Sequence, residues 1–96
     1  MKEIKLMADY GCFPLWKAGP GEYGNIDPRS LAISLKLQAE LIRWADAFNQ
    51  TLDAKYPSNS GFKNNDDELA FRRETLRLTE LLRAELGPEY VVNAHL

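Results

Sequence analysis

Two stretches of the chain carry apolar residues that predict the buried faces of helices, and they constrain the fold more than any other feature. The first stretch follows Ser34, a suitable helix N-cap, and its face comprises Leu37, Leu41, Trp44, Ala45, Phe48 and Leu52. The second stretch has a face made of Leu69, Phe71, Leu76, Leu78, Leu82 and Leu86. The pattern predicts two amphipathic helices, from Ser34 to about Ala54 and from Asn65 to Leu86.

Turn-forming residues bound both helices. Pro57 ends the first helix, and residues 57–64 form a turn-rich connection. Asn65 and Glu68 make a capping-box-like pair at the start of the second helix. Gly87-Pro88 stops this helix, because glycine adopts the left-handed conformation and proline cannot continue the helix.

The two ends of the chain alternate apolar and polar residues, as half-buried strands do. This alternation covers residues 3–10 and the tail from Tyr90 to Leu96. Residues 11–33 hold four of the six glycines and three of the five prolines, yet they also carry several aromatic residues. We expect an ordered excursion with a hairpin that turns at residues 19–21 and adds a third strand.

These elements predict an α+β fold in one domain, residues 1–96. The expected architecture is two antiparallel helices packed on a small, mainly antiparallel sheet, in the order β-(β)-α-α-β. If the helices form a hairpin, the first and last strands should run antiparallel to each other.

Composition narrows the classes of function. The formal net charge is −2 and basic residues are interleaved with acidic ones, which argues against a nucleic-acid partner. No apolar run is long enough to span a membrane, and the N-terminus lacks the apolar core of a signal peptide. Cys12 is the only cysteine, so an internal disulfide is impossible and a reducing, cytoplasmic location is expected.

None of the candidate chemical motifs has the context that it needs. Gly19-x-Gly21-x-x-Gly24 resembles a dinucleotide fingerprint, but no helix is expected to follow it. Cys12 has His95 as the only histidine partner, at a chain end, and no third member of a catalytic set is identifiable. One cysteine and one histidine do not make a zinc site. We therefore expect no catalytic residues, no metal and no cofactor.

The remaining aromatic residues indicate where a partner binds. Trp44, Phe48 and Phe71 lie on helical stripes and belong to the core. Aromatic residues in loops or at element ends suit a contact surface, and acids around them complement a basic partner. Equally, such residues can cap the edges of a small core. The candidate protein-binding residues are Asp9, Tyr10, Trp16, Tyr23, Asp53 and Phe62.

Several segments resemble a family of small uncharacterised bacterial proteins of about this length. They are Ala8-Asp9-Tyr10-Gly11-Cys12-Phe13-Pro14-Leu15-Trp16, Asn25-Ile26-Asp27-Pro28, Ser60-Gly61-Phe62 and Gly87-Pro88-Glu89-Tyr90. The resemblance covers nearly the whole chain and implies no activity or catalytic residue. By analogy of size and style, such proteins resemble the immunity or antitoxin partners of bacterial competition systems.

The preferred hypothesis is a non-enzymatic protein-binding module, specifically an immunity protein that neutralises a toxin by occlusion. The binding surface would comprise residues 9–26 and the connection from Asp53 to Phe62. The alternative is a small ligand-binding protein or enzyme with a site near Asp9, Tyr10 and Cys12. A homodimer that completes a short sheet through an edge strand is a third hypothesis.

Overall fold

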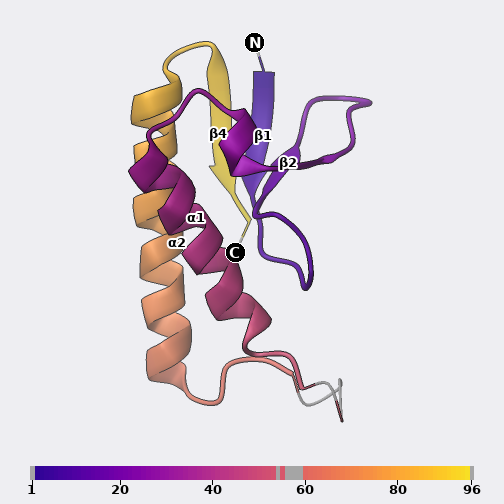
Figure 1. Cartoon of the computed structure of the whole chain (residues 1–96), viewed down its shortest axis with the longest axis vertical. Coiled ribbons are helices and arrows are strands. Elements are labelled where there is room, and N and C mark those ends of the chain that lie inside the picture. The colour runs from indigo at the N-terminus through magenta and orange to yellow at the C-terminus, as the bar shows by residue number, and fades with distance from the viewer. Residues whose placement is uncertain (1, 54, 56–59, 96) are drawn as a thin grey trace.

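A computed structural model of the chain confirms the α+β class (Figure 1) and describes residues 2–53, 55 and 60–95. The elements, in chain order, are β1 (Lys2–Leu6), β2 (Leu15–Lys17), β3 (Asn25–Ile26), the 3₁₀ helix η1 (Pro28–Ser30), α1 (Leu35–Asn49), α2 (Asn65–Leu86) and β4 (Tyr90–Ala94). Neither α-helix in the described part of the chain is long and apolar enough to cross a membrane.

The sheet has the strand order β3-β2-β1-β4 and is mixed. β1 pairs antiparallel with β2, and β2 pairs antiparallel with β3 around the predicted hairpin. β1 and β4 run parallel, with Lys2 opposite Tyr90 and Leu6 opposite Ala94. The expectation that the first and last strands run antiparallel is therefore wrong.

The parallel pairing follows from where the chain enters α1. The main-chain N–H of Ser34 donates to the carboxylate of Glu85, which places the start of α1 beside the end of α2. The N–H of Lys2 donates to the carbonyl of Glu89, which places the start of β1 beside the start of β4. Residues 11–34 thus return the chain to the end of the sheet where β1 began. A direct connection from β1 would have started α1 at the opposite end and produced the antiparallel pair.

Caps define the helix boundaries. The Ser34 hydroxyl accepts a hydrogen bond from the N–H of Leu37 at 3.1 Å, as predicted. The cap of α2 is Asn64, whose side chain accepts from the N–H of Asp67 at 2.8 Å, so the predicted capping pair at Asn65 is displaced by one residue. α1 ends at Asn49, earlier than predicted; Ala54 lies outside the described residues, as do Pro57 and Leu96.

Both helices pack on one face of the sheet. The buried cluster that joins them consists of Ile4, Leu6, Leu15, Ile33, Leu37, Leu41, Trp44, Leu78, Leu82 and Val92. Leu69 and Leu76 were predicted to be buried, but they are 50% and 53% exposed. They lie on the opposite side of α2 from Leu78 and Leu82, and the threonines at 75 and 79 complete the buried stripe instead.

Candidate functional site

An aromatic cluster lies where the loop after β1, the end of α1 and the start of α2 meet. Tyr10 stacks on Phe48 with ring centroids 4.5 Å apart, and Phe62 meets Phe71 at 5.0 Å. Phe71 also stacks on Trp44 at 4.8 Å. Aromatic pairs at these separations contribute about 0.5–1.5 kcal/mol beyond their buried area. The cluster therefore holds two loops against the helix pair.

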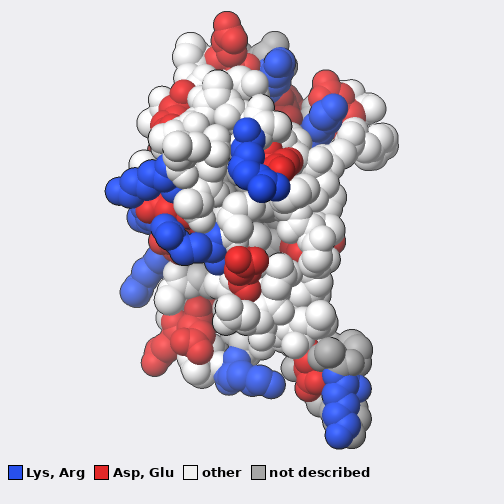
Figure 2. Space-filling view, in the orientation of Figure 1, with Lys and Arg blue, Asp and Glu red and all other residues white. Residues whose placement is uncertain are grey.

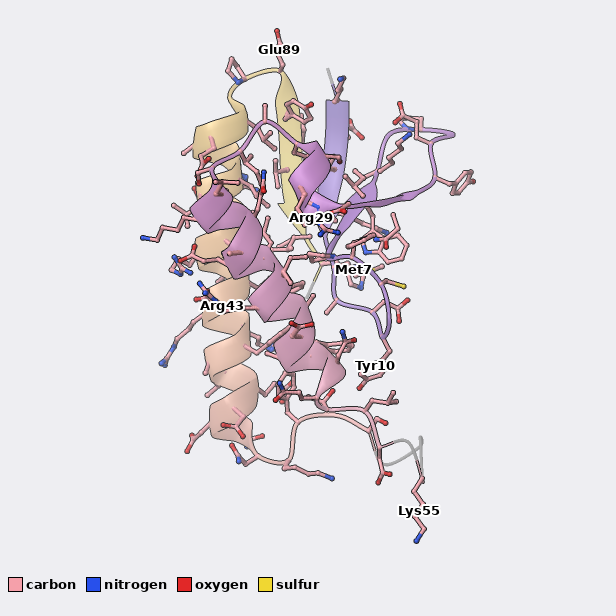
Figure 3. The ribbon with its side chains drawn as sticks, viewed as in Figure 1. Met7, Tyr10, Arg29, Arg43, Lys55 and Glu89 are labelled. Carbon is pink, nitrogen blue, oxygen red and sulfur yellow. The ribbon has the colours of Figure 1, made fainter. Side chains whose placement is uncertain are left out.

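Hydrogen bonds fix the loop after β1 against the end of α1. The Tyr10 hydroxyl lies 2.7 Å from the Thr51 hydroxyl oxygen, and the N–H of Gly11 donates to the side chain of Asn49 at 3.1 Å. Figure 3 shows Tyr10 beside the lower end of α1. Asp9, next to Tyr10, is exposed on this anchored loop.

The connection between the helices is tied to the same place. The N–H of Gly61 donates to the carbonyl of Thr51 at 2.9 Å, and the N–H of Asp53 donates to the Ser60 hydroxyl at 2.8 Å. Four of the six predicted binding residues therefore gather at this end of the molecule: Asp9, Tyr10, Asp53 and Phe62. Tyr10 and Phe62 are half-buried there.

The other two predicted residues lie elsewhere. Trp16 on β2 points to the sheet face opposite Leu15, the face that neither helix covers. Its indole N–H donates to the carbonyl of Met7 at 3.0 Å. Tyr23, in the turn between β2 and β3, is 89% exposed. The structure thus separates the predicted surface into a hairpin part and a helix-connection part.

The residues of the alternative site lie differently with respect to the hollow that Cys12 lines. Cys12 lines a hollow of about 360 Å³ with Phe13, Asp46 and others, and neither Asp9 nor Tyr10 contributes to its lining. His95 lines a different hollow, of about 250 Å³. Within the described residues, no group of three or more potential metal ligands occurs.

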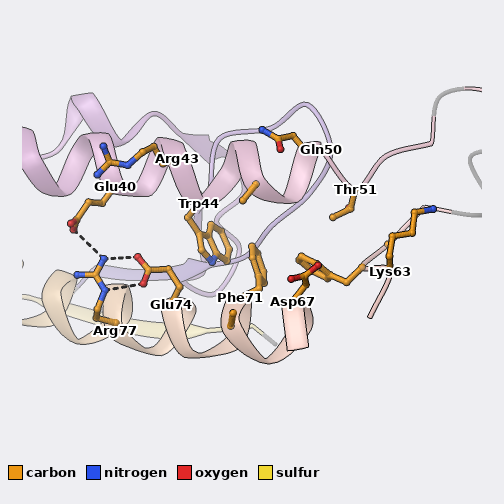
Figure 4. Close-up of a pocket in the computed structure, with 14 residues that line it drawn as sticks. Glu40, Arg43, Trp44, Gln50, Thr51, Lys63, Asp67, Phe71, Glu74 and Arg77 are labelled. Carbon is orange, nitrogen blue, oxygen red and sulfur yellow. Dashed lines mark hydrogen bonds and ion pairs between the residues drawn. The ribbon is translucent and has the colours of Figure 1, made fainter. Parts of the chain in front are cut away.

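A groove of about 550 Å³ lies between α1 and α2 (Figure 4). Trp44 and Phe71 line it from opposite helices, and Phe62 lines it from the connection. Ala47 and Ala70 also line the groove, and both are exposed. Their short side chains leave a hollow where larger residues would fill the space between the helices.

An ion cluster lies at one end of this groove. Arg77 on α2 donates to Glu74 at 2.9 Å and lies 3.4 Å from Glu40 on α1, as the dashed lines in Figure 4 show. These hydrogen bonds hold the pKa of Glu74 below its usual value, and the charges of Arg77 and Arg43 lower the pKa further against the effect of burial. The same contacts raise the pKa of Arg77.

Two other cations line the groove. Arg43 projects from α1 and Lys63 from the connection, and both are labelled in Figure 4. Among the described residues, neither has an ion-pair partner within 4.0 Å. On the molecular face seen in Figure 2, blue and red side chains alternate, so no broad patch of one sign covers the helices.

A family model described as Serratia CdiI immunity protein-like matches residues 2–95. The chain belongs to this family. The match spans every helix and strand of the fold and confirms the immunity-protein-like resemblance of the sequence. None of the curated proteins compared with the chain matches it.

For this immunity-protein-like chain, the sequence pattern predicted a binding surface at the aromatic loop residues and gave no prediction of the groove. Alanine has no functional group, so Ala47 and Ala70 do not mark a site in the sequence. They line a hollow only because α1 and α2 pack with these positions along the same groove. The one signal available was the pair of small residues beside Trp44 and Phe71 on the two helical stripes. Using that signal requires the register between the helices, which a single sequence does not specify.

Proposed function

We propose that this chain is a toxin-neutralising immunity protein that binds a toxin protein and covers its working surface. The observation that carries the proposal is the family match over residues 2–95. We further propose that it acts in the cytoplasm, because Cys12 has no second cysteine with which to form an internal disulfide.

The distribution of charges favours binding over chemistry. The pKa shifts of Asp27, Arg29, Glu74 and Arg77 all arise from ion pairs within the chain. Perturbed groups in such pairs commonly have structural roles. Asp9, Tyr10 and Cys12 would need a shared cavity to act together on a substrate, and Cys12 lines its hollow without the other two.

Two surfaces support occlusion. The first is the β2–β3 hairpin with Trp16 and the exposed ring of Tyr23, where an aromatic anchor can enter a partner without unfolding this chain. The second is the helix-connection end. Here the rings of Tyr10 and Phe62 hold the loops, so their role in binding is to position the loop that carries Asp9 and the connection that contains Asp53.

The experiment has two stages. The tagged chain is first used to isolate a stoichiometric partner from the source bacterium, with the mass of the bait measured by light scattering. The partner is then expressed in a sensitive host with and without this chain. Growth arrest by the partner alone, relieved by co-expression, supports the proposal. A partner that is harmless alone, or arrest that co-expression leaves unchanged, contradicts it, and a bait mass of two chains without a partner favours the homodimer.

A further inference from the structure

We propose that the groove between α1 and α2 docks a segment of the toxin partner that carries an apolar side chain beside a carboxylate. The inference rests on the proposed function and adds the binding surface and the chemistry of the segment. It also places the contact at the helix connection rather than at the β2–β3 hairpin.

The floor of the groove is apolar and held in place. The indole N–H of Trp44 donates to the Thr75 hydroxyl at 3.0 Å, and the indole ring stacks on Phe71. Trp44 is only 3% exposed, so it supports the floor from beneath, and the half-buried ring of Phe71 provides the surface that a partner side chain would contact. Because the orientation of the supporting indole is fixed, the floor needs no rearrangement to receive a side chain. A preformed hollow of about 550 Å³ with an aromatic floor is within the size range of ligand pockets.

The walls leave the floor accessible. Ala47 on α1 and Ala70 on α2 are exposed and line the groove. An apolar anchor from a partner can therefore pass between them to reach the aromatic floor. Interface energy is concentrated in such anchors, which fill a pocket and exclude water.

The charges around the groove indicate why the docked segment would carry a carboxylate. Its carboxylates already have partners within the chain: Glu40 and Glu74 contact Arg77, and Asp67 accepts from Asn64. Its cations Arg43 and Lys63 have no such ion pairs among the described residues. Figure 4 shows Arg43 and Lys63 toward opposite ends of the groove, so a carboxylate on the incoming segment would meet one of these cations without displacing an existing pair.

The first test fills the groove. Ala47→Met and Ala70→Met together place two flexible side chains over the floor, at exposed helical positions where methionine is well tolerated. Ala39→Met with Ala84→Met is the matched control, because both residues are exposed helical alanines outside the groove lining. We expect the groove variant to lose at least about tenfold in affinity for the toxin and the control to keep the affinity of the parent.

The second test removes the cations. Arg43→Gln with Lys63→Gln removes two positive charges from the groove, and Lys36→Gln with Arg73→Gln removes the same charge from exposed positions outside it. We expect only the groove pair to weaken binding, about tenfold at low salt and less at 1 M NaCl, where the charges are screened. Equal effects of the two pairs would overturn the choice of a carboxylate.

A third measurement uses the two tryptophans as internal reporters. In a proton–nitrogen NMR spectrum of the labelled chain, addition of the toxin should shift the indole signal of Trp44 and leave that of Trp16 unchanged. A shift of the Trp16 signal without a shift of the Trp44 signal, together with full binding by the methionine variant, would overturn docking in the groove. Docking would then be assigned to the hairpin, and the proposed function would stand. A chain that protects no cell and binds no toxin would instead remove the proposed function, and this inference with it.

Discussion

Replacing Thr75 with valine should reveal how the groove floor is stabilised. The Thr75 hydroxyl accepts from the indole N–H of Trp44 and donates to the carbonyl of Phe71, and Thr75 is fully buried. Thr75→Val keeps the shape of the side chain but leaves the indole N–H without its acceptor. A buried donor that loses its partner costs about 1–3 kcal/mol, so we expect a loss near 2 kcal/mol in the free energy of unfolding.

The assay is urea unfolding followed by helical circular dichroism, combined in a double-mutant cycle with Trp44→Phe. A loss of about 2 kcal/mol moves the midpoint by about 0.7–2 M urea, since small proteins have slopes of roughly 1–3 kcal/mol per molar. In the Trp44→Phe background no N–H is left unpaired, so Thr75→Val should then cost less than about 0.5 kcal/mol. Equal costs in both backgrounds would refute the proposed role of the hydrogen bond.

Three further changes test other parts of the structure. Tyr23→Ala should change the free energy of unfolding by less than about 0.5 kcal/mol in urea, because the ring is 89% exposed. Asn64→Ala should cost about 0.5–2 kcal/mol in the same assay and Asn65→Ala much less, because Asn64 caps α2; the reverse order would restore the predicted cap. The lowered pKa of Glu74 means that its pairing with Arg77 stabilises the fold above pH about 4.5 and is lost as pH falls through the lower, folded-state pKa. Thermal melts from pH 6 to 3 should therefore show a smaller acid-induced loss for Glu74→Gln than for the parent chain.

Local patterns predicted the helices well because each depends on neighbouring residues. Ser34 and Gly87 mark the start of α1 and the end of α2, and the structure confirms both. The hairpin at residues 19–21 is confirmed for the same reason: Gly21 has a φ of +72°, and the carbonyl of Gly19 accepts from the N–H of Glu22. Leu69 and Leu76 were misassigned because leucine alone does not define a face when threonines fill part of the buried stripe.

Features that depend on contacts between residues far apart in the sequence could not be predicted from local sequence patterns. The direction of β4 relative to β1 is determined by the path of residues 11–34, and no local sequence pattern predicts that path. The groove depends on which residues of α1 face α2. The grouping of Asp9 with Asp53 depends on contacts of Tyr10 and Gly11 across 41 and 38 residues.

The groove separates the residues that maintain the fold from those that a partner would meet. Trp44 belongs to the floor and to the core, so removing its ring would cost about 3–5 kcal/mol, the range for large aromatic truncations. Ala47, Ala70 and Arg43 are exposed, and substitutions at such positions change stability by only about 0.5 kcal/mol. If the groove docks the toxin as proposed, a change of toxin partner can be matched by changes in the walls without loss of the fold. We expect immunity proteins with this fold that neutralise different toxins to keep the aromatic floor and to differ at the wall positions.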